Sequence, residues 1–146
     1  MGRFLVCQAG RVTRRAILST ALAVYLAFVG VVTLDPTPPD TVTNPWVLRL
    51  LEFVPIGYEN LEFIANIGMF VPIGVLVMLL SGHAWLAIAV GIALTCGIEF
   101  TQQFLPERFT DVRDLLANTL GAAIGALAVA AVARVSRRRT RTAPSV

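Results

Sequence analysis

Four apolar runs, each about 20 residues long, limit what this chain can fold into. They cover residues 16–34, 61–80, 84–104 and 115–133. A helix of about 20 apolar residues is long enough to cross the hydrocarbon core of a bilayer. Only 14% of the residues are charged and the mean hydropathy is +0.75, whereas soluble domains carry about 25% charged residues. The chain is therefore predicted to be an all-α membrane protein, a four-transmembrane-helix bundle that forms one domain over residues 1–146.

The arginines predict the direction of the four spans. The chain has no lysine, and nine of its twelve arginines lie in the two tails, before residue 16 and in the basic tail 134–146. Because Lys and Arg concentrate on the cytoplasmic side, both termini are predicted to be cytoplasmic, with the 35–60 and 105–114 loops outside the cell membrane. Basic tails of this kind bind anionic lipid. This accounts for the pI of about 9.5 without a nucleic-acid partner.

Two short segments complete the predicted topology. The Ser-Gly-His segment 81–83 is a tight turn, so the second and third spans should form an antiparallel hairpin. In the outer loop, Asn44 followed by Pro45 is typical of a helix start, with Asn as the N-cap and Pro at the first helical position. Trp46 would then anchor a short helix in the outer interface. The alternative is a segment that covers the mouth of the bundle.

Polar side chains occupy the outer ends of three predicted spans. The second span enters from outside, so Glu62 and Asn66 lie in its first two turns. The third span ends at Phe104, which places Glu99 about 7.5 Å inside that end at a rise of about 1.5 Å per residue. Asn118 lies in the first turn of the fourth span. Three helices are therefore expected to bring polar groups to one depth, in the outer half of the bilayer.

Helical spacing also predicts which faces meet. In the third span, Gly91, Thr95 and Glu99 lie four residues apart, and Gln102 or Gln103 continues the same stripe. In the fourth span, a Gly-x-x-x-Gly pair follows Asn118 on one face. Small residues at this spacing let a neighbouring backbone approach closely. We therefore expect Gly121 and Gly125 to contact another helix.

The loop between the third and fourth spans adds four charged side chains: Arg108, Asp111, Arg113 and Asp114. Asp114 is predicted to cap the fourth helix, because it directly precedes the apolar run that begins at Leu115. Arg108 is expected to pair with Glu99, or to serve as the shared counter-charge of Asp111 and Asp114.

These polar groups have two interpretations. Amides and carboxylates at helix ends often cap helices and join them by interhelical hydrogen bonds, and we assign this structural role to Asn66, Asn118, Asp114 and Gly121. An acid inside a membrane span is by default a hypothesis for a functional site. We assign that role to Glu99, Gln102, Arg108 and Asp111.

The spacing of these residues resembles the signature of VanZ-like membrane proteins over residues 62–125. The signature is carried by Glu62-x3-Asn66 with NIGMFVPIG, and by Glu99-x2-Gln102-x5-Arg108-x2-Asp111-x2-Asp114-x3-Asn118-x2-Gly121. Glu107 departs from it, since many relatives have a small residue before the arginine. The resemblance implies that one ligand site is formed by Glu62, Asn66, Glu99, Gln102, Arg108, Asp111, Asp114 and Asn118.

The resemblance implies a function in the cell envelope. The founding member of the VanZ-like family is associated with resistance to the glycopeptide antibiotic teicoplanin. The first hypothesis is a non-enzymatic protein that binds a membrane lipid or a lipid-linked cell-wall intermediate at the outer leaflet. The alternative is a small membrane enzyme in which Glu99, with Asp111 or Glu62, performs acid/base chemistry on a lipid-linked substrate. A third hypothesis is a structural or assembly partner, whether monomeric or oligomeric.

The sequence favours neither a cofactor nor a metal centre. It has no glycine-rich phosphate loop and no nucleophile elbow. Its one histidine, His83, belongs to the predicted cytoplasmic turn, far from the acids, so a zinc site is not expected. A hard cation such as Mg²⁺ or Ca²⁺ could bind the carboxylates. Arg108 and Arg113 can supply the positive charge instead, so we predict no metal site.

Overall fold

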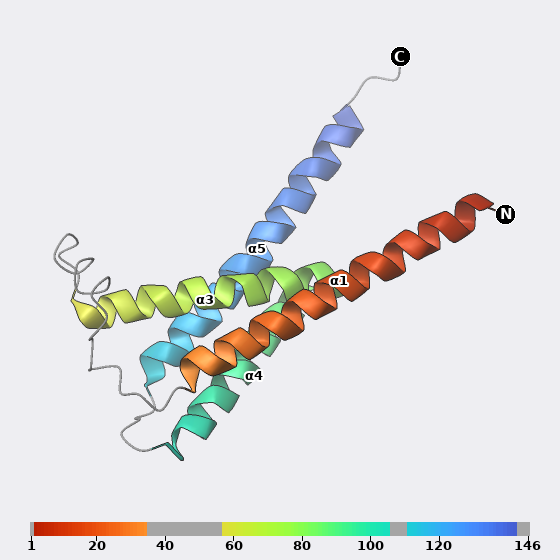
Figure 1. Cartoon of the computed structure of the whole chain (residues 1–146). Coiled ribbons are helices and arrows are strands. Elements are labelled where there is room, and N and C mark those ends of the chain that lie inside the picture. The colour runs from red at the N-terminus through yellow and green to blue at the C-terminus, as the bar shows by residue number, and fades with distance from the viewer. Residues whose placement is uncertain (1, 35–56, 106–110, 143–146) are drawn as a thin grey trace.

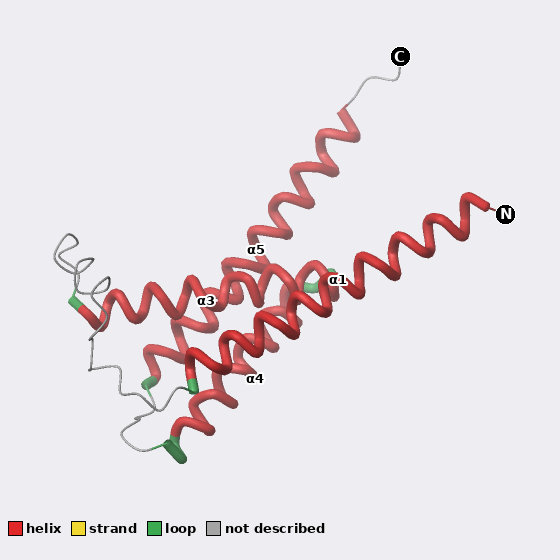
Figure 2. The backbone as a smooth tube through the Cα atoms, viewed as in Figure 1, coloured by secondary structure: helices red, strands yellow, loops and turns green. Residues whose placement is uncertain are grey.

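The computed structural model describes residues 2–34, 57–105 and 111–142, which contain four α-helices (Figure 1). These helices are α1 (Gly2–Thr33), α3 (Tyr58–Ser81), α4 (Ala84–Gln102) and α5 (Val112–Thr142). Each contains a stretch long and apolar enough to cross a membrane: Val12–Thr33, Asn60–Ser81, Ala84–Gln102 and Val112–Arg139. The prediction of an all-α protein with four membrane-spanning helices is therefore confirmed for the described residues (Figure 2). The predicted interfacial helix at Trp46 lies outside them.

The two termini extend from the same end of the bundle. In Figure 1 the N-terminal part of α1 and the C-terminal part of α5 project to the upper right. The C-terminal ends of α1 and α4 and the N-terminal ends of α3 and α5 gather at the opposite end, which we call the loop end. This arrangement suits an even number of spans. That the termini are cytoplasmic remains a prediction from the arginines.

The most extensive contact between described helices is that of α3 with α5. It depends on glycine residues where the two helices cross. A Cβ atom at Gly121 would overlap the carbonyl oxygen of Ile67 and lie 2.9 Å from the Cβ of Phe70. At Gly125 it would overlap the carbonyl oxygen of Val71. The predicted close approach at the Gly-x-x-x-Gly pair is therefore confirmed. The α3 side of the contact has its own glycine, Gly74, whose Cβ position is occupied by the backbone of α5.

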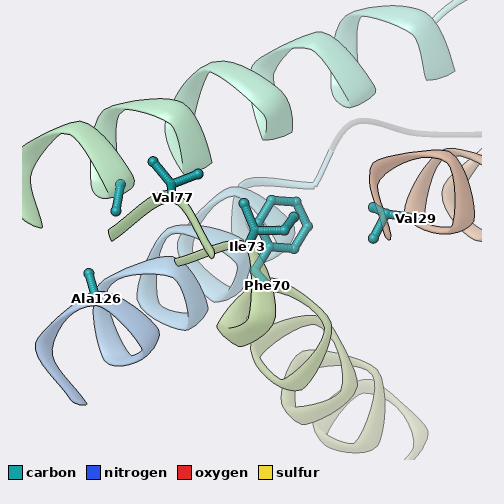
Figure 3. Close-up of a cluster of buried hydrophobic side chains, with 6 residues drawn as sticks. Val29, Phe70, Ile73, Val77 and Ala126 are labelled. Atoms are coloured by element: carbon teal, nitrogen blue, oxygen red, sulfur yellow. The ribbon is translucent and has the colours of Figure 1, made fainter. Parts of the chain in front are cut away.

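A small apolar core holds the four helices together (Figure 3). Its members are Val29 of α1, Phe70, Ile73 and Val77 of α3, Ala87 of α4 and Ala126 of α5. α1 packs mainly against α3, where the Tyr25 hydroxyl donates a hydrogen bond to the Met69 carbonyl oxygen at 2.9 Å. Much of α1 is exposed, as expected for a helix that faces lipid.

The helix ends follow local chemistry. Gly82 adopts a φ of 72° and its N–H donates to the Met78 carbonyl oxygen at 2.8 Å, which ends α3 and starts the predicted hairpin to α4. At α5, the predicted cap is wrong: Asp111, rather than Asp114, is the N-cap. The Asp111 side chain accepts a hydrogen bond from the Arg113 N–H at 2.8 Å, so the helix begins at Val112 and Asp114 lies in its first turn.

Candidate functional site

The polar stripe predicted on the third span is the buried face of α4. The buried residues of this helix are Ala87, Gly91, Thr95, Glu99 and Gln102. They repeat every three or four residues, so they lie on one side of the helix. Gln103 is exposed, so Gln102, and not Gln103, continues the buried stripe. The stripe carries Glu99 and Gln102 into the loop end of the bundle.

These side chains line a cavity of about 180 Å³, which we call the inner pocket. Its described lining comes from all four helices: Val32, Thr33, Glu62, Asn66, Met69, Ile98, Glu99, Gln102, Asp114 and Asn118. Six of the eight predicted ligand residues are among them. Asp111 lines the adjoining cavity instead, and Arg108 lies outside the described residues. The expected pairing of Arg108 with Glu99 therefore stays a prediction.

Two hydrogen bonds join α5 to the neighbouring helices at this depth. Asn66 of α3 donates from Nδ2 to Asp114 Oδ1 at 2.7 Å. Asn118 of α5 donates from Nδ2 to Thr95 Oγ1 of α4 at 2.9 Å, and both residues are buried. The structural role predicted for Asn66, Asn118 and Asp114 agrees with these contacts.

Gln102 has a structural contact that the sequence did not indicate. Its Nε2 donates to the backbone carbonyl oxygen of Thr33 at 2.8 Å, which connects α4 to the end of α1. Thr33 itself donates from Oγ1 to the Val29 carbonyl oxygen at 2.8 Å. Gln102 therefore connects two helices in the wall of the pocket, and its functional role stays a prediction. No local signal in the sequence pairs residues so far apart.

Glu99 differs from the other acids of the pocket. It is only 7% exposed, and its Oε2 has no hydrogen-bond partner among the described residues. Its carboxyl group lies in the electrostatic field of the Asp114 carboxylate. Asn118 is 4% exposed, and its Oδ1 also has no described partner. Since buried polar atoms almost always have hydrogen-bond partners, these two oxygens mark a place where a donor belongs.

A second cavity of about 320 Å³, the outer cavity, adjoins the inner pocket. It is lined by Glu62, Phe63, Asp111, Arg113 and Asp114, and it shares Glu62 and Asp114 with the inner pocket. Two carboxylates thus lie where the cavities meet.

Arg113 is the positively charged residue in the described lining of the outer cavity. It donates to Asn60 Oδ1 at 3.3 Å, and its guanidinium carbon lies 5.9 Å from the ring centroid of Phe63, which is a cation–π distance. The sequence reasoning missed Asn60 and Phe63. Their i,i+3 spacing, which places both on one side of the helix, was the signal available.

The helices and the pocket define a class before any comparison is made: a multi-pass helical membrane protein with an acidic, buried pocket between its spans. A model of the VanZ/LLP1 family matches residues 14–133. The chain belongs to this family, and the match extends over nearly all of the four spans. No curated protein matches the chain, and no solved structure matches it.

The described residues offer no arrangement typical of a metal centre. In residues 2–34, 57–105 and 111–142 no group of three or more His, Cys, Asp or Glu side chains is placed to hold a metal ion. The polar groups that line the two cavities are carboxylates, amides, one threonine and one arginine, which recognise ligands through hydrogen bonds and charge.

Proposed function

We propose that the inner pocket binds the head group of a membrane lipid or of a lipid-linked cell-wall component at the outer leaflet. The observation that carries the proposal is Glu99, a buried carboxylate inside a membrane-spanning helix, one oxygen of which has no hydrogen-bond partner in residues 2–34, 57–105 and 111–142. A charge at the centre of a membrane helix destabilises insertion by about 2.5–3.5 kcal/mol on insertion scales, and Glu99, nearer the end of α4, carries a part of this cost. A ligand that hydrogen-bonds to the free oxygen offsets part of this cost.

A purely structural role accounts for the site less well. If the polar residues served only to join helices, each buried polar atom should have a protein partner. Asn66 and Gln102 satisfy this expectation. One oxygen each of Glu99 and Asn118 has no partner in the part of the chain that the structure describes, and both residues line the same cavity. Binding at the pocket is therefore the better account of these two residues.

The role proposed for the protein is a non-enzymatic one in the cell envelope. The arginine distribution predicts that the loop end lies outside, where lipids and cell-wall intermediates meet glycopeptides. As the resemblance to VanZ-like proteins implies, binding there would change how teicoplanin reaches its target. Where the host tolerates teicoplanin, we expect that tolerance to require Glu99.

The alternative function, acid/base chemistry on a lipid-linked substrate, is favoured by one pair of acids. Glu62 and Glu99 line the same cavity. Asp111 lines the adjoining cavity, which shares Glu62 and Asp114 with the inner pocket. A general acid and a general base must both come within hydrogen-bond reach of the reacting group. An enzymatic version of the proposal therefore uses Glu99 with Glu62, or with Asp111 from the adjoining cavity.

The experiment is to purify the full chain from its native membrane and to identify co-purified lipids by mass spectrometry. We expect one lipid class to be enriched over the bulk membrane, and we expect Glu99→Gln to lose this enrichment while the protein stays folded. Gln103→Ala is the matched control, because its side chain is exposed and it directly follows the last residue of the same helix. Equal lipid profiles for the wild type and Glu99→Gln would contradict the proposal. Conversion of a supplied lipid to a product of different mass would favour the enzyme.

A further inference from the structure

The inner pocket contains two buried oxygen atoms that have no hydrogen-bond partner among the described residues, Glu99 Oε2 and Asn118 Oδ1. Each of the three amide side chains of the pocket donates one N–H to a protein oxygen: Asn66 to Asp114, Gln102 to Thr33, and Asn118 to Thr95. A carboxylate oxygen and an amide oxygen both accept hydrogen bonds. A ligand that satisfies these two oxygens must therefore bring hydrogen-bond donors.

The charges of the described residues indicate the charge of that ligand. Three charged side chains line the inner pocket, Glu62, Glu99 and Asp114, and all three are acidic. Arg113 lies at the outer cavity, together with the acid Asp111. A phosphate or pyrophosphate group would enter the inner pocket against three like charges, and such repulsion is strong where water is excluded. A cation is attracted by the same field.

Among cations, an ammonium group suits this lining better than a metal ion. A primary ammonium has three N–H donors and needs no fixed coordination geometry. Glu99 Oε2 and Asn118 Oδ1 can accept two of the three, and a carboxylate shared with the outer cavity can accept the third. A metal ion would need several oxygens converging on one point, which the described acids do not provide.

The position of the pocket indicates that the ammonium is carried by a lipid. The cavity of about 180 Å³ has room for a small head group. Val32, Met69 and Ile98 form an apolar part of its wall. Val32 is 47% exposed on a membrane-spanning helix. The pocket therefore adjoins the surface of the protein that contacts lipid.

We infer that the inner pocket recognises the primary ammonium group of an aminophospholipid head group, with Glu99 and Asn118 as acceptors and the phosphate left outside the pocket. The inference rests on the proposed function, since it names the chemistry of the lipid that the site binds. It also separates this lipid from polyanionic cell-wall intermediates.

The test is native mass spectrometry of the purified full chain in detergent with an equimolar lipid mixture. The mixture contains phosphatidylethanolamine, its N-acetylated derivative, phosphatidylcholine and phosphatidylglycerol, all with the same acyl chains. We expect phosphatidylethanolamine to be retained about tenfold over the other three, because only it offers a charged N–H donor. Glu99→Gln should remove this preference, and Gln103→Ala should keep it. Free ethanolamine is added in a separate series and should not displace the lipid at equal concentration.

Each result distinguishes the inference from the proposed function. Selective retention that depends on Glu99 supports both. A lipid bound without preference for the primary amine, or with a preference for phosphatidylglycerol, overturns the inference and leaves lipid binding standing. No retained lipid of any kind overturns both. Displacement by equal free ethanolamine overturns the assignment to a lipid. If Glu99→Gln does not fold, the comparison of the four lipids on the wild type still decides the head-group chemistry.

Discussion

Replacing Gly121 by Ala should force α3 and α5 apart at their crossing. The added Cβ would overlap the Ile67 carbonyl oxygen and lie 2.9 Å from the Phe70 Cβ. Neither of these atoms is the end of a flexible side chain, so the backbone itself must shift. Overpacking of this kind costs about 1–3 kcal/mol. We therefore expect Gly121→Ala to lower the free energy of unfolding by about that amount, and Gly121→Leu to lower it further.

Gly97→Ala is the matched control, because nothing lies within 4 Å of the Cβ position at Gly97. An alanine in a helix interior is favoured over glycine by about 0.5–1 kcal/mol. This gain applies to both variants, so the difference between them isolates the clash. The variants are purified in detergent and denatured, and the loss of helix is measured by circular dichroism. If Gly121→Ala matched Gly97→Ala within about 0.5 kcal/mol, the crossing of α3 and α5 at this glycine would be refuted.

Three further predictions concern topology, capping and interhelical bonding. In a background without native cysteines, a cysteine introduced at Thr110 should react with an impermeant maleimide added outside intact cells. A cysteine introduced at Ser136 should not react. The reverse pattern would place the pocket on the cytoplasmic side. Asp111→Ala should lower stability by about 1 kcal/mol and Asp111→Asn should not, because Asn and Asp cap helices equally well; equal melting of both variants would exclude the capping role. A double-mutant cycle of Thr95→Ala and Asn118→Ala should give a coupling energy of about 0.6 kcal/mol, the average for hydrogen bonds between membrane helices. If the effects of the two substitutions on stability were additive, this hydrogen bond would contribute nothing.

The sequence was sufficient to predict the spans, because length and apolarity are properties of each segment alone. The end of a membrane span is not the end of a helix, however. The run predicted for the fourth span ends at residue 133, where the arginines begin, yet α5 continues to Thr142. Arginine and alanine are good helix formers, so the basic segment extends the helix that the membrane span began.

The site was predicted in part. Spacing along one helix predicted the buried stripe of α4, but spacing alone could not choose between Gln102 and Gln103. The choice depends on the Thr33 carbonyl oxygen of α1, which accepts from Gln102 and belongs to another part of the sequence. The cap of α5 was placed three residues late, because Asp111 and Asp114 both suit an N-cap. Only the hydrogen bond of Asp111 to the N–H of Arg113 distinguishes them.

The peripheral position of α1 has a consequence for how the protein is made. This helix leaves the ribosome before its packing partners, Met69 and Gln102, are synthesised. It must therefore stay in the bilayer as a single inserted segment until they follow, which its long apolar surface permits. The glycine contacts lie among α3, α4 and α5, so these three can associate without it. The pocket wall at Thr33 is complete only once α1 has docked against the helices made after it.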